Sequence, residues 1–237
     1  MIRTDEVTYR DEDTVCKGFV AYEDGNASSQ PAVLISHMAG GREEFVESKA
    51  RELAVLGYVG FALDMYGENR RGATLEEGRA LMKPLLDDRT LLARRIRAAL
   101  SALRALPQVD TKRIAALGYC FGGLCVLDLA RSGADIRGVI SMHGLLKPSY
   151  LEAQRISAKI LVLHGHDDPL APPEDVRVFQ EEMTAAGADW QMHIYGGTQH
   201  AFTNPKASNA AAGLVYNPVA ERRAWISLVA FLSEVLR

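Results

Sequence analysis

The chain contains a cysteine, an aspartate and a histidine in an order that suits nucleophilic catalysis. Cys120 lies within the segment GYCFGG at 118–123, Asp168 follows a short apolar run, and His200 lies in a later polar loop. A thiol can attack a carbonyl carbon when a histidine takes up its proton and a carboxylate orients that histidine. The three side chains therefore predict acyl transfer through an acyl-cysteine intermediate.

The segment around Cys120 has the pattern of a nucleophile elbow. The apolar run 114–117 leads into it and is typical of a short buried strand, and the run 124–127 that follows is typical of a helix. Glycines on both sides of Cys120 remove Cβ atoms where a sharp turn would crowd strand against helix. The start of the helix would also favour the thiolate. The alternative is a small buried apolar cysteine without a role, and the flanking glycines favour the elbow over it.

Two adjacent aspartates are candidates for the orienting acid. We prefer Asp168, because it directly precedes the turn at 169–170, whereas Asp167 could cap that turn. His164 and His166 flank the pair and are better explained by local hydrogen bonds. A metal site formed by these residues would lack a matching ligand cluster elsewhere in the sequence. We therefore expect no metal and no cofactor.

His200 is the preferred general base, because nucleophile, acid and histidine follow one another as in the α/β-hydrolase arrangement. His37 competes for this role, but it belongs to the loop after the apolar run 32–35, which normally supplies an oxyanion-hole donor. The expected donors are the backbone N–H groups of Phe121 and Ala39. The candidate substrate-binding residues are His37, Met38, Tyr119, Phe202 and Asn204.

The rest of the chain predicts the elements that must position these side chains. Apolar runs at 32–35, 58–63, 114–117, 138–141, 160–163 and 190–195 alternate with helical stretches. This pattern predicts an α/β fold with a mostly parallel central sheet and helices on both faces. Alternating apolar and polar residues at 6–22 predict an N-terminal antiparallel hairpin, and 24–26 predicts a turn.

Helices are expected from about residue 43, over 85–106, after the elbow, from 172 to 187, and from about 218 to the C-terminus. The polar stretch 67–84 is interpreted as an excursion over the sheet that could form a mobile lid. Because functional sites of parallel sheets lie at the carboxyl ends of the strands, Cys120, Asp168 and His200 should meet at the carboxyl edge of the sheet.

Composition limits the class of protein. A chain of 237 residues without repeats or linkers predicts a single domain over 1–237. The net charge of −3 gives no indication of a nucleic-acid or membrane partner. The sequence shows neither a secretory signal nor an apolar stretch long enough to span a bilayer. Three cysteines without metal-ligand spacing suit a reducing compartment. We therefore expect a cytoplasmic monomer or homodimer with a small-molecule substrate.

Over nearly its whole length, the sequence resembles the dienelactone hydrolase family. The resemblance rests on GYCFGG at 118–123, LHGHDDP at 163–169, GGTQHAF at 196–202, and LGYV at 56–59 with DMYG at 64–67. It implies the α/β-hydrolase fold and hydrolysis of esters or lactones through an acyl-cysteine, without metal or cofactor. It also implies that Cys120, Asp168 and His200 form the triad.

Two positions depart from the pattern of the founding members of that family. Met38 stands where they carry a glutamate that helps to control ionisation of the thiol, so activation would rest on His200 alone. Asn204 stands where they carry an arginine that binds the carboxylate of the substrate. These departures favour a less charged ester or lactone at least as strongly as dienelactone.

Other functions fit the same residues. The triad could serve an acyltransferase or a thioesterase. A catalytically silent member of the fold could instead use Cys120 for binding or for thiol redox sensing. Against the silent alternative, a scaffold without activity has no need to keep a nucleophile, an acid and a base together.

Overall fold

The centre of the fold is one sheet built from the apolar runs of the sequence. The computed structural model describes residues 1–25, 28–149 and 155–237, and its eight-stranded sheet has the order β1-β2-β4-β3-β5-β6-β7-β8. The strands are β1 (Ile2–Asp11), β2 (Thr14–Glu23), β3 (Gln30–Ser36), β4 (Val59–Ala62), β5 (Val109–Tyr119), β6 (Gly138–Met142), β7 (Lys159–Gly165) and β8 (Trp190–Tyr195). β1 pairs antiparallel with β2 and β2 with β4, while the remaining neighbours are parallel. The predicted hairpin and mostly parallel sheet are confirmed.

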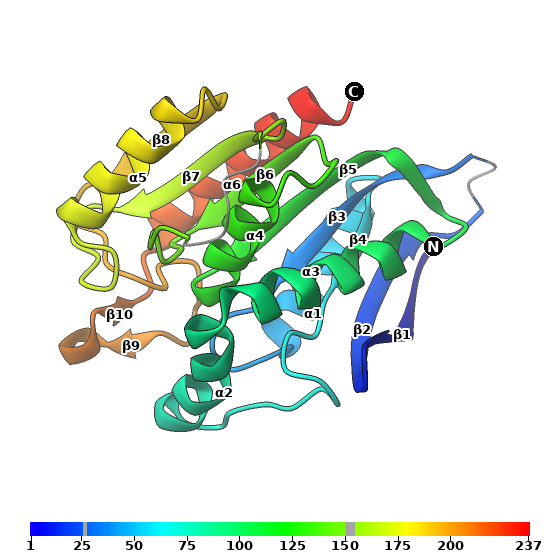
Figure 1. Cartoon of the computed structure of the whole chain (residues 1–237), viewed down its shortest axis with the longest axis horizontal. Coiled ribbons are helices and arrows are strands. Elements are labelled where there is room, and N and C mark those ends of the chain that lie inside the picture. Colours follow the sequence, from blue (N-terminus) through cyan, green and yellow to red (C-terminus); the bar gives the residue numbers. More distant parts are fainter. Residues whose placement is uncertain (26–27, 150–154) are drawn as a thin grey trace.

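Helices cover both faces of this sheet (Figure 1). The helices are α1 (Glu44–Val55), α2 (Leu75–Asp87), α3 (Arg89–Arg104), α4 (Phe121–Arg131), α5 (Pro173–Ala185) and α6 (Pro218–Val235). Buried side chains of α3, α4 and α5 form one apolar cluster with the sheet, and those of α1 and α6 form a second cluster on the opposite face. The two clusters hold the strands between the helix layers and so fix the edge at which the strands end.

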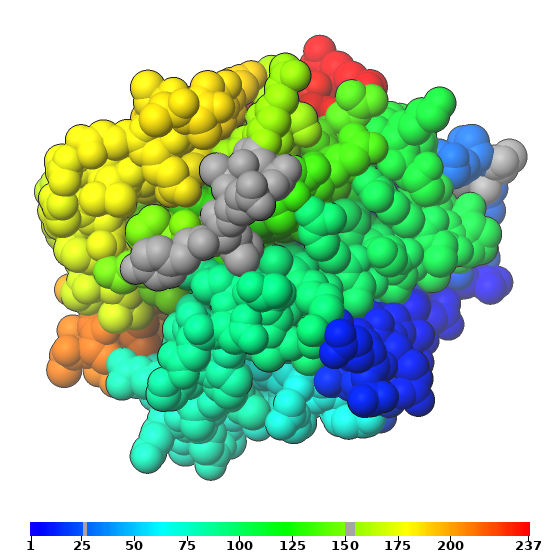
Figure 2. All heavy atoms as spheres, viewed as in Figure 1, coloured from blue at the N-terminus to red at the C-terminus, as the bar shows by residue number. Residues whose placement is uncertain are grey.

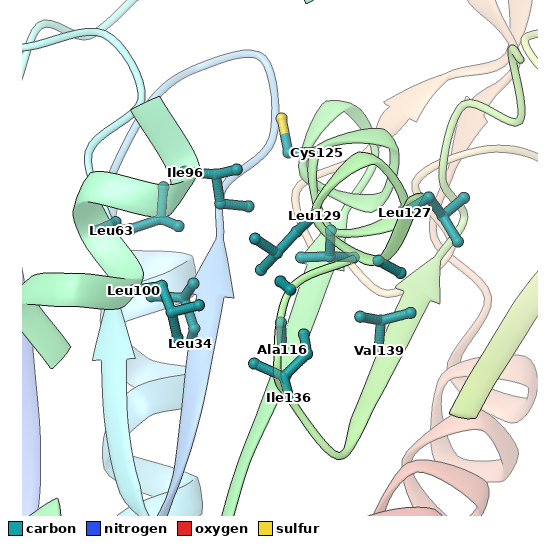
Figure 3. Packing of buried hydrophobic residues seen from close by; sticks show 14 of the residues in the cluster. Leu34, Leu63, Ile96, Leu100, Ala116, Cys125, Leu127, Leu129, Ile136 and Val139 are labelled. Carbon is teal, nitrogen blue, oxygen red and sulfur yellow. The ribbon is translucent and has the colours of Figure 1, made fainter. Parts of the chain in front are cut away.

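The larger cluster shows how the elbow helix is anchored (Figure 3). Leu129 of α4 and Leu100 of α3 belong to it together with Leu34 of β3 and Ala116 of β5, and all four are almost fully buried. Burying such side chains stabilises the fold by about 1.5–3 kcal/mol for each large aliphatic group. The strand before Cys120 and the helix after it are therefore held by the same core.

The helix predicted over 85–106 is wrong in its extent, because two helices meet within it. Asp88 has extended backbone angles (φ −120°, ψ 93°) and separates α2 from α3. Its carboxylate accepts hydrogen bonds from the N–H groups of Thr90 and Leu91, which caps the first turn of α3. Leu85 is a buried residue of the preceding α2. The apolar spacing continues across the break, which is why it conceals the boundary.

Two segments that were predicted as irregular contain regular structure. The excursion 67–84 includes most of α2, which begins after Thr74, whose hydroxyl accepts from the N–H of Glu77. The loop after β8 contains the two-stranded hairpin β9 (Ser208–Asn209) and β10 (Leu214–Val215), with a short 3₁₀ turn between them. These segments lie together at one end of the molecule (Figure 2). Mobility of the 67–84 segment stays a prediction, as does the turn at 24–26, in which residue 26 lies outside the described residues.

The elbow requires glycine for steric reasons. A Cβ atom at position 118 would lie 1.9 Å from the carbonyl oxygen of Gly122, and one at position 122 would lie 2.3 Å from the carbonyl oxygen of Ser36. These neighbours are backbone atoms, which cannot move aside without distorting the strand or the helix. The glycines let strand and helix approach closely enough to form the turn.

We expect Gly118→Ala to destabilise the fold by about 3 kcal/mol or more, because overpacking against backbone has no side chain to displace. Urea unfolding measures the free energy of unfolding directly. Gly196→Ala is the matched control, since a Cβ there meets no atom within 4 Å. Equal stability of the two variants would contradict the steric account of the elbow.

Candidate active site

The carboxyl edge of the sheet brings the three predicted side chains together. Cys120 directly follows β5, Asp168 follows β7 by a short loop, and His200 lies in the loop after β8. β6 and β7 lie between β5 and β8, and all four strands run parallel, so their ends point to the same side. Residues separated by as many as 80 positions in the sequence therefore face one another.

Cys120 occupies a strained backbone position. Its φ of +55° and ψ of −117° lie in a region that side-chain-bearing residues rarely adopt, which costs about 1–3 kcal/mol. Three backbone hydrogen bonds hold it there: Cys120 N–H donates to Met142 O (3.1 Å), and Cys120 O accepts from the N–H groups of Gly123 (3.0 Å) and Leu145 (3.3 Å). This backbone geometry places the sulfur outside the sheet, at the start of α4.

Asp168 fixes the orientation of the His200 ring. Their Oδ2 and Nδ1 atoms are 2.7 Å apart, and both side chains are fully buried. The other carboxylate oxygen accepts from the N–H groups of Leu170 (2.8 Å) and Ala171 (3.3 Å). Asp167 is exposed and makes no such contact in the described part of the chain. The structure thus pairs His200 with Asp168, the aspartate that the sequence favoured.

The surroundings of Cys120 and His200 favour the charged form of each side chain. Burial lowers the pKa of His200, but interactions with Cys120 and Asp168 outweigh it and raise that pKa to about 10. Burial raises the pKa of Cys120, but the His200 charge, followed by the backbone N–H groups of Phe121 and Ala39, brings it below its ordinary value. His200 Nε2, the ring nitrogen that Asp168 does not contact, has no hydrogen-bond partner of regular geometry within the described residues. Both pKa shifts favour a thiolate on Cys120 beside an imidazolium on His200.

The two backbone groups predicted as oxyanion donors lie near the Cys120 sulfur. The N–H groups of Phe121 and Ala39 both interact with the Cys120 sulfur. When the carbonyl carbon of a substrate bonds to this sulfur, its oxygen would meet the same two donors. The arrangement can therefore stabilise negative charge on an oxygen next to Cys120.

A pocket of about 580 Å³ opens over Cys120 and His200. Residues of helix α2 and of the loop after His200 both line it. Its apolar lining includes Met38, Leu75, Met82, Leu145, Leu170 and Leu214. Its charged and amide-bearing lining consists of Glu43, Arg79, Asn204, Lys206 and Asn209. A mostly apolar pocket with a few polar groups is typical of small-molecule sites.

The five predicted substrate-binding residues divide into two groups. Met38 and Asn204 line the pocket. The structure contradicts the other three, since His37, Tyr119 and Phe202 are buried and do not line it. Neighbouring residues of a strand or tight turn point in opposite directions, so closeness in sequence to Ala39, Cys120 or His200 does not place a side chain in the pocket.

These three side chains pack behind the site instead. Tyr119 contacts Phe45 at a ring-centroid distance of 5.0 Å, and Phe202 contacts Tyr195 at 5.6 Å. Both ring nitrogens of His37 are engaged with backbone, which also removes His37 as a candidate base. His164 is buried and His166 is exposed, and neither lines the pocket.

Sequence reasoning missed His143, which contacts the base directly. The His143 ring meets that of His200 edge to face, with centroids 5.1 Å apart, and its Nε2 lies 2.8 Å from the hydroxyl oxygen of Thr203. Burial lowers the pKa of His143 well below its ordinary value, so it stays neutral beside charged His200. Its position directly after a predicted strand, at the same carboxyl edge, was the available signal.

Two negative findings apply to residues 1–25, 28–149 and 155–237. There, no group of three or more histidine, cysteine or acidic side chains could hold a metal ion. No helix in those ranges is both long and apolar enough to cross a membrane.

The sheet order, the elbow after β5 and the histidine loop after β8 define a hydrolase of the α/β-hydrolase fold. Residues 17–236 match the model of the dienelactone hydrolase family, and the chain belongs to that family. The membership agrees with the resemblance found in the motifs around the cysteine, the aspartate and the histidine.

Several relatives and solved structures are similar to this chain. A crystal structure titled dienelactone hydrolase-like promiscuous phosphotriesterase P91, from metagenomic libraries, superimposes with a TM-score of 0.96 and 34% identity, covering 100% of this chain and 99% of that one. A putative carboxymethylenebutenolidase of Yersinia pestis is 25% identical over 85% of this chain and 79% of its own. An uncharacterized protein of Caenorhabditis elegans, K02A2.1, is 40% identical over 59% of this chain and 91% of its own.

The two pKa shifts predict an unusually reactive thiol. Because the pKa of Cys120 is lowered while burial raises those of Cys16 and Cys125, iodoacetamide should label Cys120 first at pH 7. The rate should fall as pH drops through the lowered pKa of Cys120, because protonation removes the thiolate. Mass spectrometry of tryptic peptides measures the three rates, and equal labelling would argue against a charged pair.

Replacing the orienting acid should change this pH profile. Asp168→Asn removes the negative charge that holds protonated His200, so the midpoint of Cys120 alkylation should rise by about 1 pH unit. Asp167→Asn is the matched control, because that side chain is exposed and the hydrogen bond to His200 Nδ1 is made by Asp168. A larger effect from the control would reverse the assignment of the two aspartates.

Proposed function

We propose that this chain hydrolyses carboxylic esters or lactones through an acyl-cysteine formed on Cys120, with His200 as base and Asp168 as orienting acid. The observation that carries the proposal is the Asp168–His200 hydrogen bond of 2.7 Å, buried beside a thiol of lowered pKa. Family membership supports the reaction class, and the buried geometry supports the assignment of roles.

In the first half of the reaction, the Cys120 sulfur attacks the carbonyl carbon of the ester. The carbonyl oxygen becomes negatively charged and accepts from the N–H groups of Phe121 and Ala39. When the tetrahedral intermediate collapses, the bond to the alcohol oxygen breaks and His200 Nε2 delivers its proton to that oxygen. The product is a thioester on Cys120, and the alcohol leaves.

In the second half, water replaces the alcohol. His200 Nε2, now neutral, takes a proton from the water while its oxygen attacks the thioester carbon. Asp168 keeps the ring in the tautomer that carries hydrogen on Nδ1, and it stabilises the imidazolium that forms. Collapse breaks the carbon–sulfur bond, releases the acid and restores the thiolate–imidazolium pair.

The pocket supports a substrate of low charge. Its walls are largely apolar, and Met38 and Asn204 supply no charge at the two positions where the founding members of the family carry a glutamate and an arginine. Relatives named as a lactonase in Bradyrhizobium and as a carboxymethylenebutenolidase in Yersinia pestis support lactones as one substrate class. The leading candidates are uncharged esters and lactones.

Phosphotriesters are a second candidate class. The solved structure described as a promiscuous phosphotriesterase matches this chain over its full length at 34% identity. A neutral phosphotriester also presents an electrophilic centre with an oxygen that two N–H donors can stabilise. This class suits a largely apolar pocket as well as a carboxylic ester does.

The three free cysteines suit a reducing compartment, and we propose the cytoplasm as the location. Disulfides are rare there, and an active-site thiolate would be protected from oxidation.

Cys120→Ala should abolish hydrolysis and leave the fold intact, because alanine removes the nucleophile without adding volume. Rates on p-nitrophenyl esters, lactones, thioesters and phosphotriesters, with and without an alcohol acceptor, measure the loss and distinguish a hydrolase from an acyltransferase. Cys16→Ala is the matched control, since Cys16 is buried in the β1–β2 hairpin. Unchanged activity of Cys120→Ala would remove Cys120 as the nucleophile.

His200→Asn should slow formation of the acyl-enzyme by about 10²–10⁴-fold, which is the usual contribution of general acid–base catalysis. Stopped-flow release of p-nitrophenol measures this step separately from hydrolysis of the thioester. Retained activity would show that another group removes the proton. His166→Asn serves as the control, because His166 is exposed and outside the pocket.

A further inference from the structure

The peptide unit between Met38 and Ala39 is held at both ends. Its N–H, which belongs to Ala39, interacts with the Cys120 sulfur. Its carbonyl, which belongs to Met38, accepts from His37 Nδ1 at 2.6 Å and from the N–H of Gly41 at 3.1 Å. A peptide unit is planar, so fixing the direction of the carbonyl also fixes the direction of the N–H.

The hydrogen bonds of His37 determine its tautomer. Its Nε2 accepts from the N–H of Met65 at 3.2 Å, so the ring proton must lie on Nδ1, which donates to Met38 O. The side chain is fully buried, and burial lowers its pKa, so the ring is neutral. Neither nitrogen is available for proton transfer with a substrate. His37 is thus a fixed donor to the carbonyl of Met38.

The next peptide unit is held by Tyr66. Its hydroxyl donates to Ala39 O at 2.9 Å, and its ring meets the His37 ring edge to face at a centroid distance of 4.7 Å. The Tyr66 ring also stacks on that of Phe121, at 6.0 Å and an interplanar angle of 18°. Tyr66 therefore contacts both residues whose N–H groups face the sulfur.

Helix α2 closes the other side of this loop. Gly78 packs against Ala39 so closely that a Cβ at position 78 would lie 3.0 Å from Ala39 O. The loop is therefore enclosed by His37, Tyr66 and the backbone of α2, and the Ala39 N–H has little freedom to turn away from Cys120.

We propose that His37 and Tyr66 are positioning residues of the oxyanion hole, which orient the Ala39 N–H before substrate arrives. The inference rests on the proposed acyl transfer at Cys120. A donor that is already oriented needs no reorganisation when the negative oxygen forms, which is why such donors are effective. The hydrogen bond to Met38 O also polarises the amide and makes its N–H a stronger donor.

Four variants test this role. Tyr66→Phe removes only the hydroxyl that holds Ala39 O, and His37→Phe removes both hydrogen bonds of the ring. His37→Asn keeps an amide donor near the position of Nδ1. Tyr22→Phe is the matched control, since its buried ring has a hydroxyl that contacts Asp5 in the β1–β2 hairpin, remote from the pocket. Thermal unfolding establishes which variants are folded.

With a neutral p-nitrophenyl ester, kcat should fall about 10–100-fold in Tyr66→Phe and His37→Phe, below the 10²–10³-fold cost of losing a donor entirely. KM should stay within about threefold, because the donor acts on the transition state more than on the bound ester. His37→Asn should recover most of the loss. Tyr22→Phe should leave kcat unchanged.

A second measurement needs no substrate. Because the Ala39 N–H lowers the pKa of Cys120, its displacement should move the pH midpoint of iodoacetamide labelling upward in Tyr66→Phe and His37→Phe. The labelling rate on the high-pH plateau should stay within about twofold of the unmodified chain, since that reaction develops no oxyanion.

Wild-type kcat and an unmoved midpoint in a folded Tyr66→Phe protein would overturn the inference. The inference would also be overturned if kcat of His37→Asn were no higher than that of His37→Phe, because His37 would then act through packing alone. If Cys120→Ala retains hydrolysis, the proposed function is wrong, but this result does not test the role of His37 and Tyr66. The labelling midpoint then decides separately whether His37 and Tyr66 hold the Ala39 N–H towards the sulfur.

Discussion

The strained turn at Cys120 is the constraint on which the site depends. A positive φ at a side-chain-bearing residue is unfavourable, and it persists because the strand before it and the helix after it belong to one packed core. The glycines at 118 and 122 permit this approach, since any Cβ there would meet backbone. Without the turn, the sulfur would lie within the sheet and could reach neither His200 nor the two N–H donors.

Electrostatic interactions favour the charged forms of the side chains that meet at this turn. Burial alone would neutralise both Cys120 and His200, yet each stabilises the charged form of the other, and Asp168 adds to this effect. Asp168 is in turn held by two backbone N–H groups. Neutral residues surround the charged group: His143 packs on His200, and His37 supports the opposite loop. The charged forms of the thiol and the imidazole are thus favoured together.

The sequence was most informative where a residue type has few structural uses. The GYCFGG segment predicts an elbow because only glycine fits beside so sharp a turn, and the choice of Asp168 follows from its place before a turn. The helix over 85–106 was mispredicted because apolar spacing runs through Asp88, whose capping bonds to Thr90 and Leu91 break the helix. Periodicity records which face is buried and says little about where the backbone changes direction.

The sequence by itself determined the strands of the central sheet, the family, and the identity of the three side chains at the strand ends. These depend on local patterns, in which apolar period, glycine and loop position each carry their own signal. Only the tertiary structure decided that Met38 and Asn204 line the pocket while His37, Tyr119 and Phe202 lie behind it, and that His143 contacts His200. The direction in which a loop side chain points depends on contacts with segments far away in the chain, and no local pattern encodes those contacts.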